Sequence, residues 1–103
     1  MLMERTENDK EVIFQVTGSL SGMPDSAPMF FKQVSSDLQA VKKNIVFEFQ
    51  KVMFIDSMGI GLLVGIIIKA KQLNCTVQIR NPQPLIRDIL EATQLKKLFP
   101  TLY

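Results

Sequence analysis

The residues of this chain best placed to do chemistry are Asp56 and Ser57, which follow a short apolar run and precede a longer one. The segment Asp56-Ser57-Met58-Gly59-Ile60-Gly61, here called the switch motif, predicts a passage from a strand into a helix. The first turn of a helix has backbone N–H groups without intrahelical partners and a partial positive charge, so it receives anions well.

Phosphorylation of Ser57 would add about −1.5 to −2 charges beside the Asp56 carboxylate and turn a neutral patch strongly acidic. The switch motif therefore suggests a phosphorylation switch on a docking surface. The alternative is that Asp56 or Ser57 serves only as the N-cap of the following helix, which is a common use of these residue types.

Composition excludes most catalytic and metal-binding chemistry. The chain has no histidine and one cysteine, Cys75, so it cannot build a Ser-His-Asp triad or a zinc site of histidines or thiolates. The glycines of the switch motif lack the lysine of a P-loop and the spacing of a dinucleotide fingerprint. A serine hydrolase with Lys51 or Lys69 as its base is the remaining enzymatic alternative. We predict no enzyme activity, no catalytic residue, no metal and no cofactor.

Length and charge predict one compact domain inside the cell. The 103 residues are 47% hydrophobic and 21% charged, which suits a single core. The net charge of +2 is dispersed, without a basic stripe interleaved with aromatics, which disfavours nucleic-acid binding. The charge-free run 57–68 is shorter than the ~20 residues that cross a bilayer, so no membrane insertion is expected. A single cysteine and a polar N-terminus favour the cytoplasm.

Hydrophobic periodicity predicts alternating strands and helices. Strands are expected at 12–18, at 45–55 and at 76–80, the second of them buried on both faces and broken at Gln50-Lys51. Helices are expected at 27–42, at 59–73 and from Leu85. The last helix has an apolar face of Leu85, Ile86, Ile89 and Leu90 and is followed by a closing turn or short helix before Pro100. Residues 1–10 are either a polar extension or a first edge strand. This order predicts an α/β sheet covered by helices, with Ser57 and the loop 20–25 at carboxyl ends of strands, where function is commonly found.

The helix after the switch motif carries two apolar stripes about 100° apart. One stripe can face the sheet, and the other is covered either by the C-terminal helix or by a partner protein. Gly61 and Gly65 suggest a close approach, because each costs about 1 kcal/mol relative to alanine inside a helix. Partner docking would place Ile60, Gly61 and Val64 beside Ser57 on the binding surface. The stripe that can face the sheet consists of Gly59, Leu63, Ile66, Ala70 and Leu73, and the second stripe consists of Ile60, Val64 and Ile68.

These segments resemble STAS domains of the anti-sigma factor antagonist type over nearly the whole chain. The resemblance implies one STAS domain over residues 1–103, with a mixed β-sheet covered by about four helices. It rests on the switch motif with Phe54-Ile55 before it, on Val16-Thr17-Gly18-Ser19-Leu20, on Ile45-Val46-Phe47-Glu48-Phe49, and on Leu85-Ile86-Arg87-Asp88-Ile89-Leu90 with Leu95 and Phe99.

The mechanism that the resemblance implies is partner switching. The dephosphorylated protein binds an anti-sigma factor that is also a serine kinase, and a sigma factor is released. Phosphorylation of Ser57 breaks the complex, and a phosphatase acting on phospho-Ser57 restores it. The alternative is a STAS scaffold subunit of a stress-signalling assembly or of a lipid-transport ATPase complex.

Three positions depart from the family pattern. Ser21 stands where an acidic residue of the partner surface is common, and Asp25 is the candidate to supply that charge. Met58 stands where Ser or Thr often follows the phosphoacceptor, which leaves Ser57 as the only hydroxyl of the motif. Gln94 replaces a glycine often found near the C-terminus. We expect Ser21 and Asp25 to join Ile60, Gly61 and Val64 in binding the partner.

Overall fold

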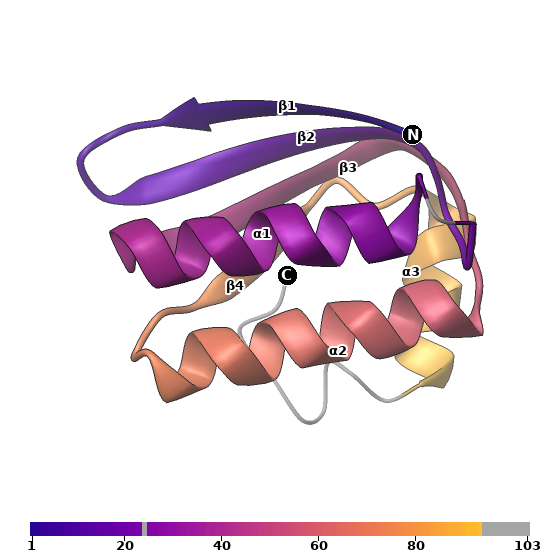
Figure 1. The fold of residues 1–103 in the computed structure, drawn as a ribbon. Coiled ribbons are helices and arrows are strands. Elements are labelled where there is room, and N and C mark those ends of the chain that lie inside the picture. Colours follow the sequence, from indigo (N-terminus) through magenta and orange to yellow (C-terminus); the bar gives the residue numbers. More distant parts are fainter. Residues whose placement is uncertain (24, 94–103) are drawn as a thin grey trace.

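The computed structural model describes residues 1–23 and 25–93, which form a mixed β-sheet with helices packed on it (Figure 1). The strands are β1 (Leu2–Glu7), β2 (Glu11–Leu20), β3 (Asn44–Ile55) and β4 (Val77–Arg80), and the helices are α1 (Ala27–Val41), α2 (Ser57–Gln72) and α3 (Pro84–Ala92). The predicted α/β class is confirmed. The described residues hold three helices rather than about four, and the short helix expected before Pro100 lies outside them.

The sheet order is β1-β2-β3-β4, with β1 antiparallel to β2 and the other neighbours parallel. Residues 1–10 therefore supply a first edge strand, which is one of the two interpretations of that segment. The turn between β1 and β2 is closed by Asn8, whose Oδ1 accepts hydrogen bonds from the backbone N–H groups of Lys10 and Glu11, both at 2.9 Å.

Strand β3 runs without interruption, so the expected break at Gln50-Lys51 is wrong. A β-bulge lies there instead, since the register passes from Gln15 opposite Glu48 to Thr17 opposite Lys51. A second irregularity follows where Gly18 faces Val52 and Ser19 faces Phe54. Each extra residue shifts the inward and outward alternation of the strand. The second half of β3 is therefore not buried on both faces: Met53 is 60% and Phe54 47% exposed.

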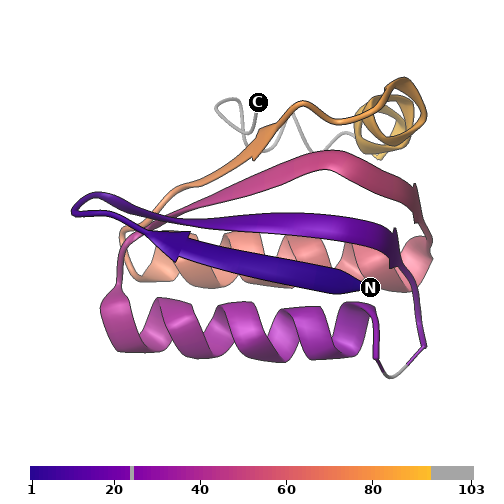
Figure 2. The same cartoon turned by 90° about the horizontal axis from the view of Figure 1, so that it is seen from above.

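Helices α1 and α2 lie side by side against the sheet, and α3 lies apart from them, across β3 in Figure 2. The ring of Phe47 is central to the core, with ring centroids of Phe14, Phe30 and Phe49 between 5.1 and 6.0 Å away. Cys75 is buried.

In α3, Ile86 and Leu90 point into the core, whereas Leu85 is 54% exposed. The expectation that Leu85 belongs to the buried face of this helix is wrong. Residues four apart share a helix face, and the preceding residue lies about 100° away from it. The inward face of α3 is therefore narrower than the run of apolar residues suggested.

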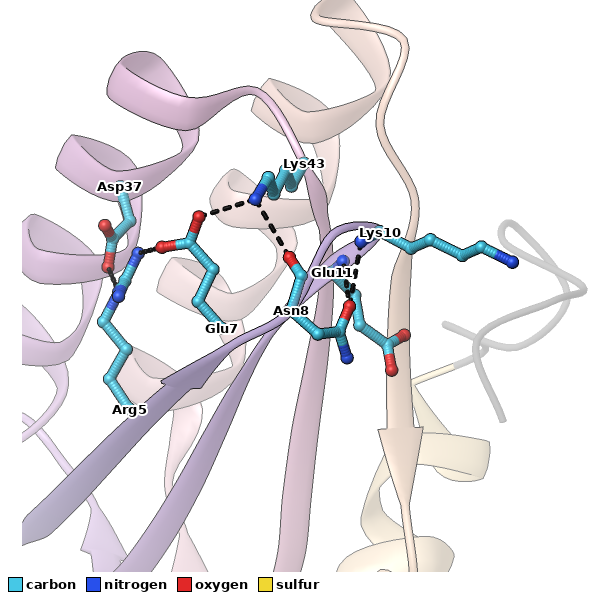
Figure 3. A network of polar contacts seen from close by, with 7 residues as sticks. All are labelled: Arg5, Glu7, Asn8, Lys10, Glu11, Asp37 and Lys43. Carbon is cyan, nitrogen blue, oxygen red and sulfur yellow. Dashed lines mark hydrogen bonds and ion pairs between the residues drawn. The ribbon is translucent and has the colours of Figure 1, made fainter.

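A polar network ties the edge strand to α1 (Figure 3). Arg5 donates to Asp37 Oδ2 at 2.7 Å and to Glu7 Oε1 at 2.6 Å, and Lys43 Nζ donates to Glu7 Oε2 at 2.6 Å and to the carbonyl oxygen of Asn8 at 2.9 Å. The hydrogen bond from Lys43, followed by that from Arg5, lowers the pKa of Glu7. Because these side chains are exposed to solvent, the network guides the docking of β1 more than it stabilises the fold.

Candidate functional site

Ser57 is the first residue of α2, and Asp56 alone separates it from the carboxyl end of β3 at Ile55. The residue is exposed. No hydrogen bond involves its hydroxyl among the described residues. An exposed serine without an internal partner can enter the active site of a modifying enzyme without disrupting any contact of the fold.

Asp56 is the N-cap of α2, with extended backbone angles of φ −103° and ψ −175°. Its Oδ1 accepts a hydrogen bond from the Gly59 N–H at 2.9 Å, and its Oδ2 accepts one from the Gly22 N–H at 3.1 Å. The hydrogen bond from Gly59 is the main cause that lowers the pKa of Asp56, and the one from Gly22 adds to it. The N-cap interpretation is therefore confirmed for Asp56, and the carboxylate is ionised at neutral pH.

This cap changes how a phosphate on Ser57 would be received. The sequence suggested that the free amides of the first turn would bind the phosphate. The Gly59 amide is instead already bonded to the Asp56 carboxylate. A phosphoryl group on Ser57 would therefore lie beside a fixed negative charge at the helix start.

The described residues of the β2–α1 loop, 21–23 and 25–26, adjoin the start of α2 through Gly22. Ser26 is buried, and its Oγ accepts a hydrogen bond from the Ser21 N–H at 2.8 Å and donates one to the carbonyl oxygen of Ser19 at 2.6 Å. Ser21 also bonds α1 through its carbonyl oxygen, which accepts from the Ala27 N–H at 2.9 Å. Ser21 is thus half-buried and anchors the loop with its backbone, while Asp25 is exposed beside it.

The glycines of α2 have three different surroundings. A Cβ on Gly59 would lie 2.3 Å from the carbonyl oxygen of Leu20, so α2 touches the end of β2 at this point. A Cβ on Gly65 would lie 3.0 Å from the ring of Phe31, so the close approach expected there is made by α1 of the same chain. A Cβ on Gly61 would meet nothing within 4 Å. Of these glycines, Gly61 alone leaves its surface free for another molecule.

The second apolar stripe of α2 is neither fully buried nor fully exposed. Ile60 and Val64 are half-buried and pack against the core, and Ile68 is 47% exposed. The expectation that the C-terminal helix covers this stripe is wrong for α3, which lies across β3 from α2 (Figure 2); residues 94–103 lie outside the described residues. Near Ser57, Gly61 is thus exposed, whereas Ile60 and Val64 are half-buried.

Four exposed apolar side chains lie on the segments that adjoin Ser57, and we call them the apolar rim. They come from the β2–α1 loop, the end of β3 and the start of α2, and their exposed fractions are 63% for Met23, 60% for Met53, 47% for Phe54 and 50% for Met58. Met58 packs toward the loop, since a Cβ on Gly22 would lie 3.7 Å from its side chain. Exposed apolar side chains of this size occur at interaction surfaces, and methionine adapts to varied partner shapes.

Sequence reasoning missed most of this rim. Met53 and Phe54 were assigned to a strand buried on both faces, and Met58 was noted only as a departure from the family pattern. The available signal was the density of large apolar side chains immediately before and after Asp56, in a segment that ends a strand. Gly22 and Ser26, which hold the loop to the site, gave no comparable signal.

Neither lysine considered as a catalytic base lies at the site. Lys69 is twelve residues beyond Ser57 in α2, about 18 Å along the helix axis. No hydrogen bond joins Lys51 or Lys69 to Ser57 in the described part of the chain. Among these same residues no group of acidic or cysteine side chains is arranged to hold a metal ion, and no helix has the length and apolar character to cross a membrane.

The comparisons with known proteins agree on one fold. The STAS domain family model matches residues 2–103. The chain is similar in structure to an anti-sigma factor antagonist from Mycobacterium paratuberculosis, with 22% identity, coverage of 96% of this chain and 82% of that one, and a TM-score of 0.78. It is also similar to a Thermotoga maritima protein described as a candidate antagonist, with 22% identity, 93% and 81% coverage, and a TM-score of 0.85.

A third similar structure is that of the anti-sigma factor antagonist SpoIIAA. In its unphosphorylated form the identity is 16%, the coverage 94% of this chain and 97% of that one, and the TM-score 0.72. For the phosphorylated form of the Bacillus protein the identity is 18%, the coverage is 93% of this chain and 86% of that one, and the TM-score is 0.75. No curated protein sequence matches the chain. At such identities the similarity to the solved structures establishes the fold.

Proposed function

Because the chain belongs to the STAS domain family, we propose that it is a cytoplasmic anti-sigma factor antagonist controlled by phosphorylation of Ser57. In its dephosphorylated form it binds an anti-sigma factor that is also a serine kinase. The observation that carries this proposal is the exposed, unbonded hydroxyl of Ser57, set between a capped helix start and the exposed side chains of the apolar rim. A kinase can reach this hydroxyl while apolar surface beside it is buried.

The same arrangement supports a release step. The interface formed by Met58, Phe54 and Met23 would be mainly apolar, so a phosphoryl group on Ser57 would have to lose its water on binding. The Asp56 carboxylate, held at the helix start by Gly59 and Gly22, is a nearby charge of the same sign. Phosphorylation therefore disfavours the complex through desolvation and repulsion, and a phosphatase acting on phospho-Ser57 would restore binding.

The test is affinity capture from the native lysate with three forms of the protein. The captured proteins are identified by mass spectrometry. Wild type should capture a kinase that, once purified, phosphorylates Ser57 in the presence of ATP. Ser57→Asp should fail to capture it. Thr6→Asp adds the same charge on the exposed edge strand β1 and serves as the matched control, which should bind as wild type does.

Other outcomes separate the alternatives. Capture of transporter or large scaffold components by wild type and by Ser57→Asp alike would favour a scaffold subunit and leave Ser57 without a switching role. Esterase activity that is lost in Ser57→Ala would instead support a hydrolase. Phosphorylation of wild type and Ser57→Ala to the same extent would place the phosphoacceptor elsewhere.

A further inference from the structure

A shallow groove of about 520 Å³ lies along α1 and is bounded by six residues of α1 and, from α2, by Lys69. Figure 1 shows the two helices side by side with their first residues at the same end of the molecule. The groove is open to solvent along its length. Its lining residues are Phe31, Lys32, Ser35, Ser36, Gln39, Ala40 and Lys69.

The charge around this groove is positive and uncompensated. Neither Lys32 nor Lys69 has an ion-pair partner in the described part of the chain. Helix α2 contains no acidic residue, and the single acidic residue of α1 is Asp37, which is bonded to Arg5. A partner segment that enters the groove would therefore meet two free ammonium groups and no repelling carboxylate.

The groove also contains a buried polar group without a partner. Ser35 is 8% exposed, and its hydroxyl oxygen has no hydrogen-bond partner among the described residues. Such a hydroxyl is costly to leave unpaired. The neighbouring Ser36 and Gln39 add further polar groups, while Phe31 and Ala40 supply an apolar wall. This lining suits a chain that carries both carboxylates and aliphatic side chains.

We propose that this groove docks an acidic, extended segment of the protein partner. From Phe31 to Ala40 the groove follows about 14 Å of helix axis, which matches about four residues of extended chain. A concave groove with two lysines fits such a segment better than a planar anionic membrane, which is bound by clusters of four to eight basic residues.

The position of the groove relates it to the proposed phosphoacceptor. Gly65, which packs against Phe31 at one end of the groove, is eight residues beyond Ser57, or about 12 Å along α2. A partner that covers Ser57 can therefore reach the groove with the same chain. The identity of that partner rests on the proposed function, whereas binding of an acidic segment does not.

The test measures binding of the full chain to a fluorescein-labelled hexapeptide of the sequence Glu-Leu-Glu-Glu-Leu-Glu, by fluorescence anisotropy at low salt. Lys32→Glu/Lys69→Glu should weaken binding about tenfold or more, as expected when charges at an interface are reversed. Lys10→Glu/Lys51→Glu carries the same change in net charge at exposed positions outside the groove and should bind within about twofold of wild type. Binding should fall as salt rises, and amide NMR shifts should concentrate at Ser35, Ser36, Gln39 and Lys69.

Three results would overturn the inference. These are no binding of the hexapeptide at low salt, equal weakening by both lysine pairs, or binding of anionic phosphatidylglycerol vesicles through Lys32 and Lys69 without binding of the peptide. If the peptide fails while capture of the kinase still depends on Ser57, the groove assignment alone is wrong. If the peptide binds as expected and capture does not depend on Ser57, the proposed function is wrong and the groove assignment stands.

Discussion

The carboxylate of Asp56 joins the start of α2 to Gly22 in the β2–α1 loop, 34 residues earlier in the chain. One oxygen caps the helix at the Gly59 amide, and the other holds the loop at 3.1 Å. The backbone repeats this connection, because the Asp56 N–H donates to the carbonyl oxygen of Leu20 at 3.1 Å. The surface around Ser57 is therefore formed by two segments that the side chain of Asp56 holds together.

Two substitutions of Asp56 should destabilise the fold to different extents. Asp56→Asn keeps an oxygen that can cap the helix but loses the charge, and Asp56→Ala loses both hydrogen bonds. We expect the melting temperature, followed by circular dichroism, to decrease from wild type to Asp56→Asn to Asp56→Ala. Equal melting temperatures for wild type and Asp56→Ala would show that the backbone bond to Leu20 is sufficient.

Stability should decline in acid because the pKa values of Asp56 and Glu7 are lowered in the folded protein. A carboxyl group with a lowered pKa stabilises the folded state fully above its unfolded value, about 3.9 for Asp and 4.3 for Glu. That stabilisation is lost as the pH falls through the folded value. The urea midpoint should thus decrease below about pH 5, and the decrease should be smaller in Asp56→Asn/Glu7→Gln. If the urea midpoint of this variant had the same pH dependence as that of wild type, Asp56 and Glu7 would not be the groups that cause the loss of stability in acid.

Two glycines in the same helix should respond to alanine in opposite directions. Gly59→Ala forces a Cβ to within 2.3 Å of the Leu20 carbonyl oxygen, and overpacking of this kind costs about 1–3 kcal/mol or more. Gly61→Ala meets no atom within 4 Å, and should stabilise the protein by about 0.5–1 kcal/mol through helix propensity. Urea unfolding of both variants measures the difference, and destabilisation by Gly61→Ala would show that its surroundings are not open.

The apolar rim should contribute to partner affinity and not to folding. Met58→Gln and Met23→Gln remove exposed apolar surface and should each weaken binding of the kinase partner by about 1–2 kcal/mol. Because both side chains are at least half exposed, the free energy of unfolding should stay within about 0.5 kcal/mol of wild type. Affinity is measured by titration calorimetry.

The matched control for the rim is Leu2→Gln, at a position that is 71% exposed on the edge strand β1. It removes a similar apolar area on β1, which β2 separates from β3 and the start of α2, and should leave partner affinity unchanged. Loss of affinity in this control equal to that of Met58→Gln would mean that general apolar exposure, and not the rim, drives association.

Local patterns were sufficient for the order of the strands and helices and for the position of Ser57. Apolar spacing of two or about 3.6 residues reports which face a segment buries, and this signal is contained within each segment. The α/β order and the place of Ser57 at a helix start were therefore accessible from sequence, whereas the sequence left residues 1–10 open between a polar extension and an edge strand. Asp56 as the N-cap was accessible too, because its bond to Gly59 spans three residues.

Long-range contacts decided the surface around that serine. The bond from Gly22 to Asp56 and the packing of Phe31 on Gly65 join residues 34 apart in each case. The extra residues in β3 are defined only by the register with β2, and they turn Met53 and Phe54 outward. Which apolar side chains are exposed beside Ser57 depends on how neighbouring strands and helices pair, and a periodicity within one segment carries no information about its neighbours.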